Sequence, residues 1–149
     1  MENVVTNELN VLLKGEFMAM ESFEKFIHHI PDVNAKNELK KIQQNHKKHT
    51  DEIAERIQVL GGKPSRGVGM SGKVAEIISD IKDINKTDPI FYLQEAYSGE
   101  DKGIKMAREI VKGDLDTESM TLIDQILDED NSHLGTINGL ISSLKNTQH

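Results

Sequence analysis

Apolar residues recur at intervals of three and four along most of this chain, and this spacing constrains its fold more than any other feature. Such intervals place the apolar side chains in one stripe along an α-helix, and the stripe is buried against other helices. The pattern breaks at Pro31, at the Gly61-Gly62 pair and before Pro89. The sequence therefore predicts an all-α protein with four long helices, at about residues 3–29, 33–60, 89–111 and 117–144.

Three of the four predicted helices follow an aspartate that can accept a hydrogen bond from a free N–H in the first helical turn: Asp32, Asp88 and Asp116. The first and second helices are separated by a short turn, as are the third and fourth, so each pair forms an antiparallel hairpin. The segment of about 61–88 is long enough to cross the bundle, and an amphipathic stretch near 73–84 predicts a short helix within it. We expect a single domain, residues 1–149, built as a four-helix bundle of two hairpins joined by this long crossover.

Composition excludes several classes of function. The net charge is −7, and no basic block interleaved with aromatic residues occurs, so we expect no nucleic-acid partner. The chain has no cysteine, so any metal site must use His, Asp and Glu. No segment approaches the roughly 18 apolar residues of a membrane span, and the beginning of the sequence lacks the pattern of a signal peptide. We therefore expect a cytoplasmic protein without a membrane partner.

Two histidines occupy the apolar stripe of the second predicted helix. His46 and His49 continue the series of Leu39, Ile42 and Ile53, so both rings face the core. A lone core histidine is usually a satisfied packing residue, but the other three stripes are also interrupted by ionisable residues. Burying an unpaired charge costs several kcal/mol, so these residues must meet one another or a cation: Glu16, Glu100, Asp130 and His133.

The positions of these residues indicate that they meet. Glu16 and His49 are about equally far from the first turn, and Glu100 and His133 flank the second turn in the same way. An internal repeat supports this arrangement, because a shift of 84 residues aligns Glu16 with Glu100, His49 with His133, and His46 with Asp130. We interpret the chain as two related hairpins that each contribute polar residues at one level of the bundle. A metal-free, hydrogen-bonded polar layer is the alternative interpretation.

A Glu on one helix, followed about 30 residues later by Glu-x-x-His, and the whole repeated in a four-helix bundle, is the di-iron carboxylate signature. Over nearly its whole length this sequence resembles the ferritin-like superfamily of ferritins, bacterioferritins and rubrerythrins. The stretches "LLKGEFMAMESFEKF", "LGGKP" and "LQEAYSGEDKGIKMARE" are similar to a bacterial ferritin-like domain family of unknown function. The resemblance implies the fold more firmly than an activity.

The resemblance implies a role for each polar residue of the stripes. Glu16 and Glu100 would be terminal carboxylate ligands, His49 and His133 the imidazole ligands, and Asp130 would replace a bridging glutamate. Two iron ions per chain would be expected, with Fe(II) oxidation by dioxygen or peroxide as the chemistry and a homodimer as a possible assembly.

His46 departs from this pattern, because the family has a second bridging carboxylate at this position and a histidine cannot bridge two irons as a carboxylate does. The departure leaves open one metal instead of two, and zinc or manganese instead of iron. It also leaves open a non-enzymatic helical interaction or stress-associated module whose metal site is vestigial or mononuclear.

Two further features have ordinary explanations. Gly67 to Lys73 fits the spacing of a phosphate-binding loop, but Val74 stands where Ser or Thr is needed and a helix precedes the loop instead of a strand. We therefore expect no nucleotide site at this loop.

Tyr97 lies one turn before Glu100, where it either packs against the core or contacts the metal ligands.

Overall fold

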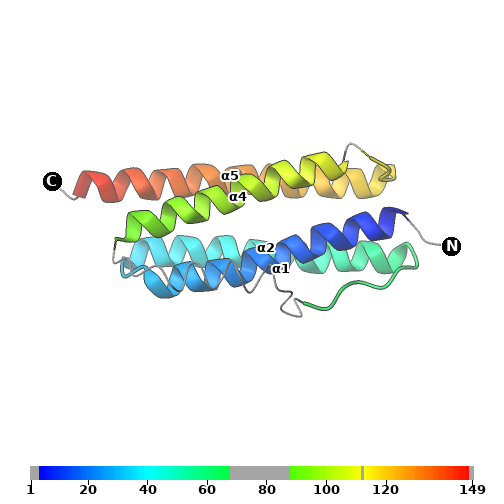
Figure 1. Cartoon of the computed structure of the whole chain (residues 1–149), viewed down its shortest axis with the longest axis horizontal. Helices are drawn as coiled ribbons and strands as arrows, with labels where there is room; N and C mark the ends of the chain where they lie inside the picture. Colours follow the sequence, from blue (N-terminus) through cyan, green and yellow to red (C-terminus); the bar gives the residue numbers. More distant parts are fainter. Residues whose placement is uncertain (1–3, 68–87, 112, 148–149) are drawn as a thin grey trace.

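The computed structural model describes residues 4–67, 88–111 and 113–147. The predicted all-α bundle of two antiparallel hairpins is confirmed (Figure 1). The predicted short helix near 73–84 lies outside the described residues. None of the described helices is long and apolar enough to cross a membrane. The described part of the chain contains four helices: α1 (Val4–His29), α2 (Val33–Val59), α4 (Pro89–Val111) and α5 (Thr117–Thr147).

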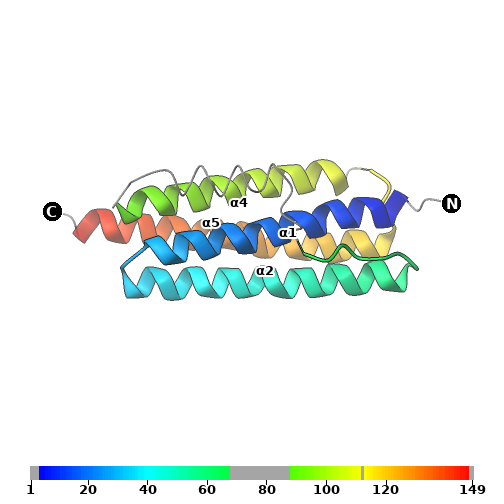
Figure 2. The ribbon, with the colours of Figure 1, turned by 60° about the horizontal axis from the view of Figure 1, so that its bottom comes forward.

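The two hairpins pack side by side along their lengths. Within the described residues, α1 contacts α2 and α4, and α5 contacts α2 and α4. The four helices therefore form a closed ring around one core, in the order α1, α2, α5, α4. Helix α2 ends at the opposite end of the bundle from the start of α4 (Figure 2).

The ends of the helices follow the local sequence. The Asp32 carboxylate accepts a hydrogen bond from the Ala35 N–H at 2.8 Å and thereby caps α2. At the other end of α2, Gly61 adopts a φ of 83°, and the Gly62 N–H donates to the Ile57 carbonyl oxygen at 2.9 Å. Gly61 suits this left-handed conformation because it has no side chain. The predicted stop at the glycine pair is therefore confirmed.

Two apolar clusters fill the core, one on each side of a polar layer. The proximal cluster lies toward the α1–α2 turn and includes Phe23, Phe26, Leu39, Ile42, Leu93, Ala96 and Ile137. The distal cluster lies toward the opposite end and includes Leu9, Leu13, Ile53, Ile57, Ile104, Ile123 and Leu127. The ionisable residues that interrupt the four apolar stripes lie between these two clusters. Water is therefore excluded from the polar layer along the bundle axis.

Asp116 caps α5 and also ties α5 to α2. Its Oδ2 accepts hydrogen bonds from the Ser119 N–H at 3.3 Å and from Arg56 Nη2 at 2.6 Å. We expect Asp116→Ala to lower the free energy of unfolding by about 1–2 kcal/mol, measured by chemical denaturation. Glu118→Ala is the matched control: Glu118 also binds Arg56, but its side chain is 79% exposed. It should cost less than about 0.5 kcal/mol, and equal losses in the two variants would contradict this account.

Candidate metal centre

The structure brings all six predicted site residues together at mid-bundle. Each helix contributes at least one of them, and each is at most 8% exposed. The histidines of α2 point toward the core, whereas Lys47 and Lys48 between them are exposed. The six side chains form two overlapping groups of possible metal ligands. One group is Glu16, His46, His49 and Asp130, and the other is His46, Glu100, Asp130 and His133.

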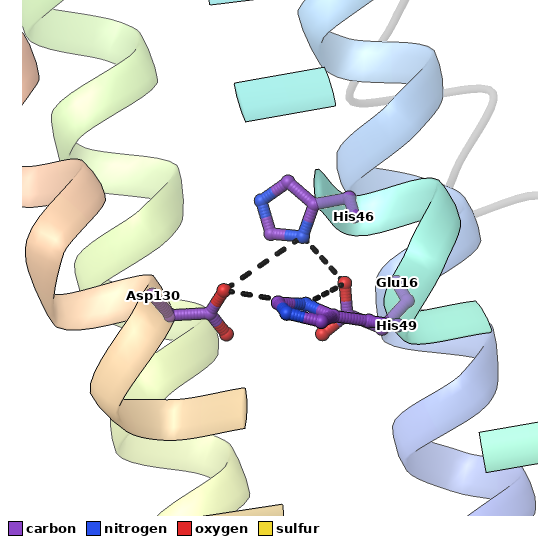
Figure 3. Close-up of side chains that lie close together, drawn as sticks. All are labelled: Glu16, His46, His49 and Asp130. Carbon is purple, nitrogen blue, oxygen red and sulfur yellow. Dashed lines mark hydrogen bonds and ion pairs between the residues drawn. The ribbon is translucent and has the colours of Figure 1, made fainter. Parts of the chain in front are cut away.

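The first group surrounds a point between α1, α2 and α5 (Figure 3). His49 Nδ1 lies 3.5 Å from Glu16 Oε2 and 3.6 Å from Asp130 Oδ1. His46 Nδ1 lies 3.9 Å from the same Asp130 oxygen. A tetrahedral ion with bonds of about 2.1 Å separates its ligand atoms by roughly 3.4 Å. These three separations are close to those that a bound divalent ion requires, whereas His46 Nδ1 and Glu16 Oε2 are in direct hydrogen-bond contact and would have to separate to bind the same ion.

The second group repeats this arrangement on the other side of Asp130. His133 Nδ1 lies 3.4 Å from Glu100 Oε2 and 3.5 Å from Asp130 Oδ1. Asp130 Oδ1 thus faces the Nδ1 atoms of both His49 and His133. Asp130 is the shared carboxylate of the two groups.

His46 lies between the two carboxylates that the groups do not share. Its Nδ1 contacts Glu16 Oε2 and its Nε2 contacts Glu100 Oε1. The pKa values of Glu16 and Glu100 are lowered, so both are ionised and can only accept hydrogen bonds; both ring nitrogens of His46 therefore donate, and the metal-free ring is an imidazolium. Burial would lower the pKa of His46, but the bonds to Glu100 and Glu16 raise it well above 6.5. His46 is therefore an internal cation of the metal-free chain.

The carboxylates of the layer have opposite pKa shifts. Burial and the nearby Glu16 charge raise the pKa of Asp130 to about 8. Burial also acts to raise the pKa of Glu16, but the neighbouring imidazoles of His46 and His49 outweigh it and lower the pKa to about 2. The pKa of Glu100 is lowered in the same way, by His133 and His46 against the effect of burial. In the metal-free chain the proton is therefore held on Asp130, and Glu16 and Glu100 are ionised.

Glu129 and Asn45, which the sequence analysis did not identify, accept hydrogen bonds from the Nε2 atoms of His49 and His133, the ring nitrogens that point away from the centre. His49 Nε2 donates to Glu129 Oε2 at 3.2 Å, and His133 Nε2 donates to Asn45 Oδ1 at 2.7 Å. Asn45 Nδ2 in turn donates to Glu129 Oε1 at 3.2 Å. The shift of 84 residues that aligns the two hairpins also aligns Asn45 with Glu129, and this was the signal that could have identified them.

These outer hydrogen bonds fix how the two histidines can bind an ion. Since Nε2 of His49 and of His133 carries the hydrogen, Nδ1 is the nitrogen available for a metal in each neutral ring. His49 Nδ1 and Asp130 Oδ1 are buried and have no hydrogen-bond partner. Buried polar atoms without partners are rare, and imidazole and carboxylate ligands suit iron, zinc and manganese. The residues present therefore fit a divalent metal.

A cavity of 510 Å³ between α1 and α4 borders this centre. Its lining includes Glu16 and Glu100 as well as the exposed Gly99 and Gly103. Within the described residues it connects the surface of α4 with the centre. The sequence predicted that Tyr97 either packs against the core or contacts the metal ligands. In the structure Tyr97 is partly buried and packs against the proximal cluster.

Comparisons with solved structures show a ferritin-like fold. A bacterioferritin-related protein from Bacteroides fragilis, described as a dodecameric thioferritin, is 17% identical with a TM-score of 0.77, over 98% of this chain and 90% of that chain. A Dps1 mutant from Mycobacterium smegmatis is 16% identical with a TM-score of 0.77, over 92% of this chain and 94% of that chain. At these identities the likeness shows the fold alone.

A two-domain protein from Anabaena variabilis, with DJ-1/ThiJ/PfpI-like and ferritin-like domains, is 18% identical with a TM-score of 0.76. The match covers 95% of this chain and 37% of that protein. No curated protein matches the sequence. Residues 4–113 match a family described as "Domain of unknown function (DUF2383)". The chain belongs to this family, and its fold is ferritin-like.

Proposed function

We propose that this chain is a ferritin-like metal-binding protein with a dinuclear iron site at mid-bundle. Glu16 and His49 would bind one ion, Glu100 and His133 the other, and Asp130 and His46 would lie between them. The observation that supports the proposal is the convergence of six buried ligands around His49 Nδ1 and Asp130 Oδ1, which have no hydrogen-bond partner. Zinc or manganese would satisfy the same ligands.

Iron bound at such a site would supply electrons to dioxygen or peroxide, so the proposed chemistry is Fe(II) oxidation or iron handling. The residues of the chain contribute position and environment. Glu129 and Asn45 hold the imidazole rings by their outer nitrogens, and the two apolar clusters cover the polar layer along the bundle axis. The cavity between α1 and α4 offers a route for small molecules. No residue of the chain is assigned a covalent role.

The ferritin-like neighbours support an iron function in general terms, since they include a bacterioferritin-related protein and a Dps protein. The Bacteroides fragilis protein is described as a dodecamer. We propose that copies of this chain associate, a homodimer being the smallest such assembly. We also propose that residues 1–149 form one domain.

A second candidate function has its own observation. His46 already bonds to both Glu16 and Glu100, so the polar layer is partly satisfied without any metal. This arrangement favours a non-enzymatic helical interaction or stress-associated module with a vestigial or mononuclear site. The two candidates differ in whether iron binds and stabilises the chain.

The outer bond to His49 provides an experiment on the proposed site. We expect Glu129→Ala to weaken Fe(II) binding by about 10- to 100-fold in an anaerobic titration, because the His49 ring loses the acceptor that orients it. Asp128→Ala is the matched control, since it removes the same charge from the neighbouring exposed position. Equal affinities of Glu129→Ala and Asp128→Ala would contradict the assigned ligand orientation. Wild-type protein that binds no Fe(II) would favour the vestigial module.

A further inference from the structure

The three imidazoles of the centre differ in where their second nitrogen points. His49 and His133 each donate Nε2 outward, to Glu129 and Asn45, and keep only Nδ1 for the centre. His46 has no such outer bond: its two ring nitrogens contact Glu16 and Glu100, one from each ligand group. The His46 ring is 3% exposed. Both of its nitrogens therefore face positions where an ion would lie.

We propose that His46 bridges the two metal ions through its ring, with Nδ1 bound to the ion beside Glu16 and Nε2 bound to the ion beside Glu100. This proposal rests on the proposed dinuclear metal function and assigns His46 a role that a terminal ligand does not have. A terminal imidazole binds one ion and keeps its second N–H.

The charge of the ligand set supports the bridge. When ions replace the hydrogen bonds of His46, its two ring protons and the proton of Asp130 leave to solvent, and the ring becomes an imidazolate with one negative charge. Together with Glu16, Glu100 and Asp130, the imidazolate brings the ligands to four negative charges, which balance two divalent ions. A neutral His46 would leave one positive charge uncompensated in a buried layer, which is costly. The bridge thus replaces the charge of the carboxylate that this position lacks.

The positions of the other rings are consistent with His46 as the central ligand. The centroid of the His46 ring lies 5.7 Å from that of His49 and 5.1 Å from that of His133. Each of these two rings points its Nδ1 toward Asp130. Among the six residues of the two ligand groups, Asp130 and His46 belong to both. The two ions would share one carboxylate and one imidazole.

Proton NMR of the Co(II)-loaded protein tests this proposal, because Co(II) shifts the N–H resonances of coordinated imidazoles out of the normal range. After anaerobic loading, metal content is measured by mass spectrometry and the shifted, solvent-exchangeable N–H resonances are counted. A bridging His46 has no N–H, so we expect two ions per chain and two such resonances, from His49 and His133. His46→Gln should leave the two resonances in place and weaken binding of the second ion by at least about tenfold. Lys47→Gln, on the exposed side of α2, should match wild type in both measurements.

The possible results separate this inference from the proposed function. Two ions with three exchangeable resonances, one of which disappears in His46→Gln, would overturn the bridge and retain a dinuclear site. One ion per chain would overturn the bridge and indicate a mononuclear site. No bound ion would overturn both the bridge and the metal-binding function.

Discussion

Replacing His46 with leucine is expected to lower the free energy of unfolding of the metal-free chain by about 3–5 kcal/mol near neutral pH. His46 is the partner of both Glu16 and Glu100, and the three side chains are buried between the two apolar clusters. Removing the imidazolium leaves two buried carboxylates without their cation. Either they remain ionised at high cost or they take up protons, and both outcomes favour the unfolded chain.

The loss in His46→Leu should depend on pH in a defined direction. The raised pKa of His46 stabilises the folded chain fully below the ordinary value of 6.5, and this stabilisation is lost as pH rises through the folded pKa. The lowered pKa of Glu16 contributes fully above its ordinary value of 4.5, and the contribution is lost as pH falls through about 2. The difference between wild type and His46→Leu should therefore be largest between pH 4.5 and 6.5.

Urea denaturation of metal-free protein at several pH values measures this difference. Gln44→Leu is the matched control, because Gln44 is an exposed polar residue two positions away on α2. It should change stability by less than about 0.5 kcal/mol. A His46→Leu variant as stable as wild type at pH 5.5 would show that His46 does not neutralise Glu16 and Glu100.

Replacing both His49 and His133 with leucine is expected to abolish stabilisation by metal. At a free Fe(II) concentration about a thousandfold above the dissociation constant, wild type should gain roughly 4 kcal/mol of unfolding free energy. The double variant should gain none, because each ligand group loses the Nδ1 that faces Asp130. The measurement is anaerobic chemical denaturation with and without Fe(II).

The two candidate functions predict opposite results for this double variant. If the layer is vestigial, leucine at both positions should raise the stability of the metal-free chain, and wild type should gain nothing from Fe(II). If the layer binds metal, the Fe(II)-dependent gain should be present in wild type and absent from the variant. His28→Leu, at an exposed position in the last turn of α1, is a control that should keep the full gain.

The helices and the inward direction of the polar residues could be predicted from sequence because both depend on local patterns. The spacing of three and four fixed which side of α2 carries His46 and His49, and Asp32 marked its start. The repeat of 84 residues indicated that the two hairpins place their polar residues at one level. Burial and capping at these positions need only the residues of one helix and its neighbours in sequence.

The outer contacts and the position of the His46 ring could not be predicted in this way. Asn45 and Glu129 lie beside the buried stripes and are half-buried. Their bonds to His133 and His49 join residues 88 and 80 positions apart, on different hairpins. Such bonds depend on how the hairpins dock and on side-chain rotamers. The contact of His46 with both Glu16 and Glu100 has the same origin.

The most direct test of a dinuclear iron site is the metal content of the chain after native purification and anaerobic Fe(II) loading. Mass spectrometry should find about two ions per chain in wild type, one for each ligand group, and none in a Glu16→Ala/Glu100→Ala variant. The variant removes the carboxylate that is unique to each ligand group. No metal in either protein, together with a melting temperature that Fe(II) does not change, would contradict the account.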